Sequence, residues 1–156
     1  MSKFRGLRLA LDLAVVKRDQ AVAVLQALRR SHGFAQSQMD QLQQYATETE
    51  ERWIMSAQKG TAPELLQHHY QFMARLQQAV LLQQAALEAS VRKVQLAEQQ
   101  VLQAEFRIAS LKTVLGSRQS DLDKQIQRQE QKQMDDFASA QTMRQARQNL
   151  ESNYGY

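Results

Sequence analysis

Three histidines are the residues of this chain best suited to chemistry, as general bases or as metal ligands. His68 and His69 are adjacent, so on a helix their side chains point about 100 degrees apart, and His32 lies far from both in the sequence. There is no cysteine to complete a zinc site or form a disulfide. Glycine-rich phosphate loops, nucleophile elbows and acidic metal-binding loops are also missing. We therefore expect no catalytic residues, no metal and no cofactor, and a protein that acts by binding other proteins.

A second kind of chemistry, contact through apolar and aromatic side chains, is suggested by two triplets with the spacing i, i+4, i+7. They are Gln38, Leu42 and Tyr45, followed by Phe72, Leu76 and Ala79. Each triplet falls on one face of a helix. Two interpretations stay open: the six residues form a docking patch, or Leu42 and Leu76 belong to a seam between helices, with Tyr45 and Phe72 beside it. We call these six residues the aromatic patch.

A stripe of apolar residues between Leu66 and Leu122 is the strongest structural signal. Nine positions in register, seven residues apart, are apolar: Leu66, Met73, Val80, Leu87, Val94, Val101, Ile108, Leu115 and Leu122. A repeat of seven makes a stripe that two helices bury by supercoiling around each other. This segment is roughly 85 Å long as a helix, which favours a coiled coil.

An earlier helix carries a matching ladder. It holds Phe4, Leu11, Arg18, Leu25, His32, Met39, Ala46 and Trp53. Arg18 and His32 interrupt it, and we expect the Arg18 stem to lie along the seam with its charge in water, and the His32 ring to be half exposed at the edge.

The break between the helices falls at residues 58–64, Gln-Lys-Gly-Thr-Ala-Pro-Glu. Gly60 suits a left-handed helix end, Thr61 with Glu64 fits a capping box, and Pro63 suits a first helical turn. A short turn makes long helices antiparallel neighbours. Partner residue numbers should then sum to about 119, which matches the two ladders and places Glu50 near His69 as a surface ion pair.

The sequence thus predicts an all-α protein, a long antiparallel two-helix coiled-coil hairpin in a single domain over residues 1–156. Helix one should cover about 4–57, the turn 58–62 and helix two about 63–147. Since helix one ends opposite Leu115, helix two should be unpaired beyond about Gly116, with a frayed tail at 148–156.

Charge is distributed unevenly along the chain, whose formal net charge is +4. Residues 1–30 hold seven Lys or Arg and two Asp, residues 31–90 hold three basic and six acidic residues, and residues 91–156 hold ten basic and eight acidic residues. No apolar run is long enough for a bilayer, and Asp12 interrupts the basic start before a signal-like apolar region forms. We expect a soluble, cytoplasmic protein with no nucleic-acid role, because no aromatic residues alternate with the charges.

Several segments resemble the FliJ family of the bacterial flagellar type III export apparatus. They are Leu11-Asp12-Leu13-Ala14, Gln41-Leu42 with Tyr45, the Gly60 turn, Tyr70-Gln71-Phe72 with Leu76, and Gln131-Lys132-Gln133-Met134-Asp135-Asp136-Phe137-Ala138 with Met143-Arg144. The similarity covers nearly the whole chain. It implies a stalk-like antiparallel coiled coil, similar to the central stalk of rotary ATPases, that is not itself an enzyme.

The resemblance also implies partners. FliJ-like proteins bind the hexameric flagellar export ATPase (FliI), the cytoplasmic domain of the export gate protein FlhA, and escort chaperones similar to FlgN and FliT, at the inner membrane of the flagellar base and without inserting into it. The family's gate-binding positions match here at Gln38, Leu42, Tyr45, Phe72, Leu76 and Ala79, while Thr49 and Gln83 depart from the family pattern.

We further hypothesise that one end of the hairpin seats in the ATPase ring. The contact residues would be Arg5, Arg8, Arg18, Arg118, Gln125, Met134 and Phe137. Three alternatives stay open: a self-associating coiled-coil scaffold, a protein whose basic N-terminal helix lies on anionic lipid, and the equivalent YscO-like stalk protein of an injectisome.

Overall fold

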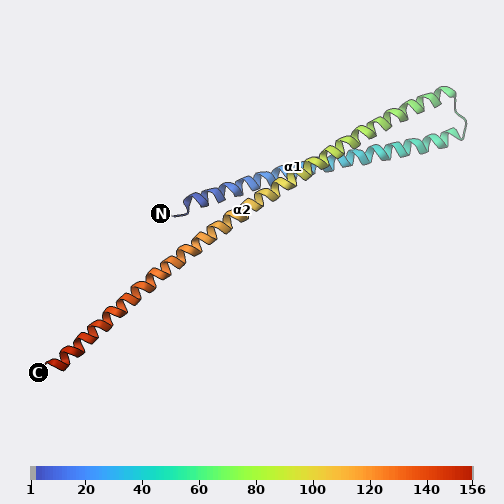
Figure 1. The fold of residues 1–156 in the computed structure, drawn as a ribbon. Coiled ribbons are helices and arrows are strands. Elements are labelled where there is room, and N and C mark those ends of the chain that lie inside the picture. Colours follow the sequence, from blue (N-terminus) through green and yellow to red (C-terminus); the bar gives the residue numbers. More distant parts are fainter. Residues whose placement is uncertain (1–2, 156) are drawn as a thin grey trace. The chain divides into compact units, whose positions relative to one another are not determined.

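The computed structural model describes residues 3–155, so that Met1, Ser2 and Tyr156 lie outside the described part. Its helices are α1 (Arg5–Ala57) and α2 (Pro63–Tyr154), joined by a short turn (Figure 1), and there is no strand among the described residues. The two long helices pack against each other in antiparallel order, with side chains of α1 contacting side chains of α2. The predicted all-α, antiparallel coiled-coil hairpin is confirmed.

Residues 12–108 form one compact unit, which contains the core of the hairpin. Six side chains are buried there: Ala14, Leu25, Met39, Leu76, Ala97 and Ile108. Leu25, Met39 and Ile108 belong to the predicted ladders, and their removal from water favours pairing of the helices. The alanines take little space at the seam, which lets the two backbones approach closely.

Polar side chains also lie in this seam. His32 is half-buried, as predicted, and its Nδ1 lies 2.6 Å from Ser90 Oγ. Because the Ser90 hydroxyl donates to the Leu87 carbonyl oxygen at 2.8 Å, the His32 Nδ1–H donates to Ser90 Oγ. Arg18 is partly covered, and its guanidinium bonds the exposed Asp19 carboxylate at 3.0 Å. The interruptions of the ladder are therefore satisfied by nearby polar groups or by solvent.

The turn between the helices uses the left-handed backbone conformation expected at Gly60, which has a φ of 91°. Pro63 is the first residue of α2, where its missing N–H costs no helical hydrogen bond. The predicted capping box is wrong. The Ala62 carbonyl oxygen accepts the first helical bond, from the Leu66 N–H at 3.2 Å, so Ala62 and not Thr61 caps α2. Thr61 Oγ1 is buried without a hydrogen-bond partner in the described residues.

Most contacts across the seam lie within about one helical turn of the predicted register, whereas the long Arg29 side chain reaches Glu98, eight residues beyond position 90, which the register places opposite it. Tyr45 contacts Phe72, and Gln83 bonds Ala35. At the turn, however, the His69 ring stacks on Trp53, with ring centroids 4.1 Å apart and an interplanar angle of 5°. No His69 ion pair with Glu50 is present within residues 3–155.

Residues 3–11 and 109–155 belong to a second unit, which we describe separately. A groove of about 240 Å³ in this unit is lined by Lys3 and Phe4 on one side and by Arg118, Leu122 and neighbouring residues of α2 on the other. The predicted end of pairing near Gly116 is therefore too early. Gly116 stays helical and does not interrupt α2, and no atom lies within 4 Å of the position a Cβ would take.

Beyond Leu122 all described residues of α2 are exposed, and the helix continues to Tyr154, past the predicted end near Arg147. Gln148, Leu150 and Glu151 are good helix formers, which accounts for the extension. The last residue of the predicted tail, Tyr156, lies outside the described residues. Neither helix contains, within residues 3–155, an apolar stretch long enough to cross a membrane.

Candidate functional site

The aromatic patch is assembled from both helices of the 12–108 unit. Tyr45 of α1 and Phe72 of α2 meet edge to face, with ring centroids 6.1 Å apart and an interplanar angle of 82°. Both rings remain accessible to solvent, at 50% for Tyr45 and 39% for Phe72, whereas Leu76, one helical turn after Phe72, is 8% exposed. The two triplets predicted from spacing therefore lie together.

The six patch residues differ in how much they offer to a partner. Leu76 belongs to the core, and Leu42 and Ala79 are half-buried. Gln38, Tyr45 and Phe72 are exposed. Leu76 therefore lies in the seam, as the second interpretation expects, while Gln38 and the two aromatic residues are exposed.

Gln83, at which the sequence departs from the family pattern, is hydrogen-bonded to the aromatic patch. Its Nε2 donates to the Ala35 carbonyl oxygen at 2.9 Å and to Gln38 Oε1 at 3.3 Å. These bonds hold the Gln38 amide at the rim of a groove of about 320 Å³ lined by Gln38, Gln41, Leu42, Tyr45 and Gln83. The spacing argument missed Gln83, although it lies seven residues after Leu76 in the same seam row.

The residues predicted to contact an ATPase ring are divided between the two units. Arg18 lies in the 12–108 unit, where it pairs with Asp19. The others lie in the second unit: Arg5, Arg8, Arg118, Gln125, Met134 and Phe137. Arg118 and Gln125 line the groove beside Phe4, whereas Met134 and Phe137 are 68% and 69% exposed and share a groove on one face of α2.

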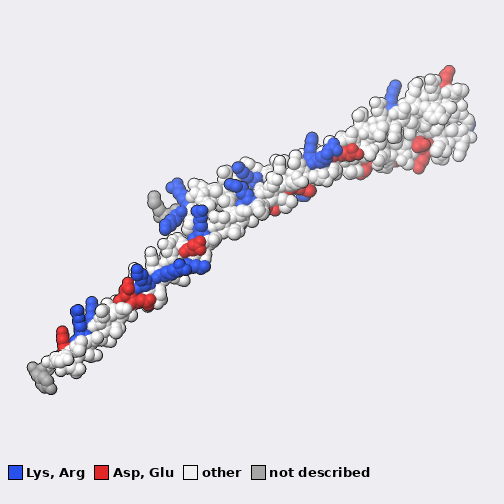
Figure 2. Space-filling model, in the orientation of Figure 1, with Lys and Arg blue, Asp and Glu red and all other residues white. Residues whose placement is uncertain are grey.

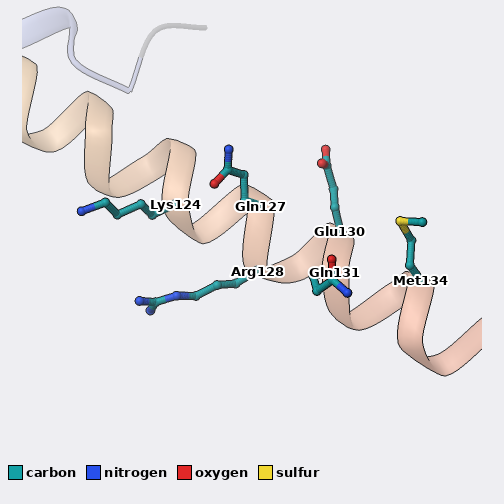
Figure 3. Close-up of a pocket in the computed structure, with 6 residues that line it drawn as sticks. All are labelled: Lys124, Gln127, Arg128, Glu130, Gln131 and Met134. Atoms are coloured by element: carbon teal, nitrogen blue, oxygen red, sulfur yellow. The ribbon is translucent and has the colours of Figure 1, made fainter.

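Figure 3 shows the residues that line an open groove of about 460 Å³ along α2: Lys124, Gln127, Arg128, Glu130, Gln131 and Met134. Lys124 and Arg128 extend in the same direction from successive turns, and Gln127, Glu130 and Met134 rise from another side of the helix (Figure 3). This stretch thus presents a pair of cations, amides and a large thioether on a single helix, without a second element covering them.

Basic residues are few near the turn: residues 46–72 hold Arg52 and Lys59 beside four acidic residues. In the view of Figure 2, the residues next to the turn present mostly uncharged side chains, and Lys and Arg are more frequent farther along both helices. The described residues form two ion pairs, Arg18 with Asp19 and Arg29 with Glu98 at 3.2 Å, and all four side chains are substantially exposed. Exposed ion pairs of this kind contribute little to the stability of the hairpin.

Two heptad-patterned helices, packed antiparallel around a narrow seam, define this chain as a coiled-coil hairpin protein. It belongs to the FliJ family: the family model for the flagellar FliJ protein matches residues 4–147. The chain is therefore a coiled-coil component of the flagellar export apparatus. No curated protein and no solved structure matches it.

Proposed function

We propose that this chain is a non-catalytic stalk that couples the hexameric export ATPase, FliI, to the export gate protein FlhA. The observation that carries the proposal is the aromatic patch, in which solvent-exposed Tyr45 and Phe72 contact each other across the two helices, and buried Leu76 follows Phe72 by one helical turn. Clustered exposed aromatic rings on a rigid base favour a protein docking site, because they bury a large area with little loss of side-chain freedom.

The gate-binding residues in this proposal are Gln38, Leu42, Tyr45, Phe72, Leu76 and Ala79. Tyr45, Phe72 and Gln38 make the direct contact, since they are exposed. Leu42, Leu76 and Ala79 act mainly by fixing the two helices beneath the rings. Gln83 holds the Gln38 amide, so it contributes to the same surface by positioning that amide.

The ring end of the proposal rests on α2 beyond Leu122, where every described residue is exposed. Met134 and Phe137 supply apolar anchors, Gln125 and Arg118 supply polar contacts closer to Phe4, and the basic residues Arg5, Arg8 and Arg18 complete the set. An isolated helix gains stability from packing, and the ATPase ring would provide that packing.

Coupling requires that each partner binds two states of the other with different affinity. ATP-driven rearrangement of the ring would then favour an export-competent gate. The same chain would bind escort chaperones similar to FlgN and FliT, and it would work in the cytoplasm, peripherally associated with the inner membrane. Its family is a non-catalytic component of export, and no reaction is assigned to the chain.

The gate contact is tested by calorimetry with the cytoplasmic domain of FlhA. We expect the Tyr45→Ala, Phe72→Ala variant to bind at least about 30-fold more weakly than the wild type, because truncating two interface aromatics commonly costs about 1 kcal/mol or more each. Its helicity should be unchanged, since neither ring is buried.

Phe106→Ala is the matched control, because Phe106 is 75% exposed on α2 in the same unit and outside the aromatic patch. It should bind the gate domain as the wild type does. Equal affinity of the double variant and the wild type would refute the gate assignment, and so would a wild type that fails to bind.

A further inference from the structure

A second apolar surface lies on the outer side of α1, away from the seam. Eight positions of one helical face between residues 13 and 34 are exposed, and none is charged: Leu13, Val16, Gln20, Ala23, Val24, Ala27, Ser31 and Phe34. Successive members are one, three or four residues apart, so they form one stripe. We call these eight residues the outer stripe.

The outer stripe faces away from the core of the hairpin. Ala14 and Leu25, which are buried in the seam, fall on the other side of the same helix by their spacing. Four large apolar side chains of the outer stripe are more than half exposed: Leu13 at 57%, Val16 at 51%, Val24 at 52% and Phe34 at 68%. Scattered exposed residues need no explanation, but a continuous uncharged face about 30 Å long is typical of an interface.

We propose that the outer stripe is a self-association surface, on which α1 of a second copy of this chain packs antiparallel. The pattern of residue sizes fits such a pair. Small residues, Ala23 and Ala27, occupy the middle, where two backbones approach most closely, and large residues, Leu13 and Phe34, occupy the ends. An antiparallel two-fold arrangement places each Leu13 close to Phe34 of the other copy, so large side chains fill the wider ends.

The charges beside the outer stripe favour the same arrangement. Asp12 and Arg30 lie on one edge of the stripe, near its opposite ends, by their positions on the helix. Neither has an ion-pair partner within residues 3–155. Because equivalent edges face each other in an antiparallel pair, Asp12 of each copy lies on the same side of the interface as Arg30 of the other, about five residues or roughly 7.5 Å from its level along the helix axis. In a parallel pair opposite edges would face each other, so Asp12 of one copy and Arg30 of the other would lie on different sides of the interface.

The expected dimer is weak. A single pair of helices in contact over about 30 Å falls at the lower end of stable interfaces, which bury about 800 Å² per partner. We expect a dissociation constant on the order of micromolar or weaker. This proposal does not depend on the gate and ring contacts, because none of its residues belongs to those two sets.

Sedimentation equilibrium of the full chain tests the proposal. We expect the mass to rise from 17.9 kDa towards twice that value as concentration increases. Val16→Glu should raise the dissociation constant at least about tenfold by placing a carboxylate in the apolar contact. Gln26→Glu, at an exposed position of α1 outside the stripe, should leave it unchanged.

A second measurement uses the absence of cysteine from the chain. Ala23→Cys lies near the two-fold axis and should form a disulfide-linked dimer under mild oxidation, whereas Gln26→Cys should not. Arg30→Asp should weaken association, and adding Asp12→Arg to it should restore it, since the two edges again carry opposite charges.

Three results would overturn the proposal: a monomer at every concentration, a dimer that is equally stable with Val16→Glu, or equal cross-linking of the two cysteine variants. A monomer that cosediments with vesicles of phosphatidylglycerol and phosphatidylethanolamine, and that loses this binding with Val16→Glu, would also overturn it and would assign the outer stripe to a lipid surface.

Discussion

Leu25→Asp is expected to separate the two helices over much of the 12–108 unit. Leu25 is 7% exposed and is one of six buried side chains in the described chain. Removing a buried leucine costs about 2–5 kcal/mol, and placing an unpaired carboxylate in the seam adds to this loss. We therefore expect urea unfolding, followed by circular dichroism, to show a free energy of unfolding lower by at least about 3 kcal/mol.

Gln26→Asp is the control for this experiment. It introduces the same residue at the next position of α1, where the side chain is exposed, so its effect should be limited to helix propensity, below about 1 kcal/mol. If both variants lose the same stability, the seam does not hold the hairpin together.

The second large effect concerns the ATPase ring. We expect Met134→Gln combined with Phe137→Gln to weaken binding to the ATPase at least about 30-fold, because two apolar anchors are lost. Stability should not change, since both side chains are more than two-thirds exposed and glutamine is a good helix former. Binding is measured by surface plasmon resonance on the immobilised ATPase.

Met143→Gln serves as the comparison for the ring experiment. Met143 is 71% exposed on the same helix but lies outside the proposed contact set, so its replacement should have little effect. Retained binding by the double variant would remove Met134 and Phe137 from the ring contact. Equal losses in both variants would mean that general apolarity of α2, and not a defined site, is recognised.

The helices and their pairing could be predicted because the seven-residue repeat of apolar residues extends over many helical turns. Single polar residues, such as Arg18 and His32, do not hide it. Leu25, Met39 and Ile108 were placed correctly in the seam on that basis. The turn was predictable because glycine adopts a positive φ without steric cost, whatever surrounds it. Gly60 does so, with a φ of 91°.

Details at the level of one turn could not be predicted in the same way. Thr61 looked like a helix cap because Glu64 follows it, yet Pro63 starts the helix one position later than that pattern requires. His69 stacks on Trp53 because the register near the turn differs by a few residues from the symmetric estimate. A shift of the register by a few residues changes which polar side chains meet, while the apolar residues still face the seam.

The aromatic patch was predictable as a group but not in its internal structure. Spacing placed Tyr45 beside Phe72 correctly, but it could not decide that Leu76 is core while Phe72 is exposed, because both have the same apolar character. Gln83 and Ser90 follow Leu76 at intervals of seven residues, so both lie along the apolar seam. A polar residue at such a position indicates a hydrogen bond across the seam, and these two residues bond Gln38 and His32.

Whether one chain holds both partners at the same time is measured most directly by capture on the immobilised cytoplasmic domain of FlhA. We predict that this domain retains the ATPase only when the chain is added. Tyr45→Ala with Phe72→Ala should abolish capture while ATPase binding persists, and Met134→Gln with Phe137→Gln should abolish it while gate binding persists. Competition, in which the ATPase displaces the chain from FlhA, would contradict the coupling of ring and gate by a single stalk.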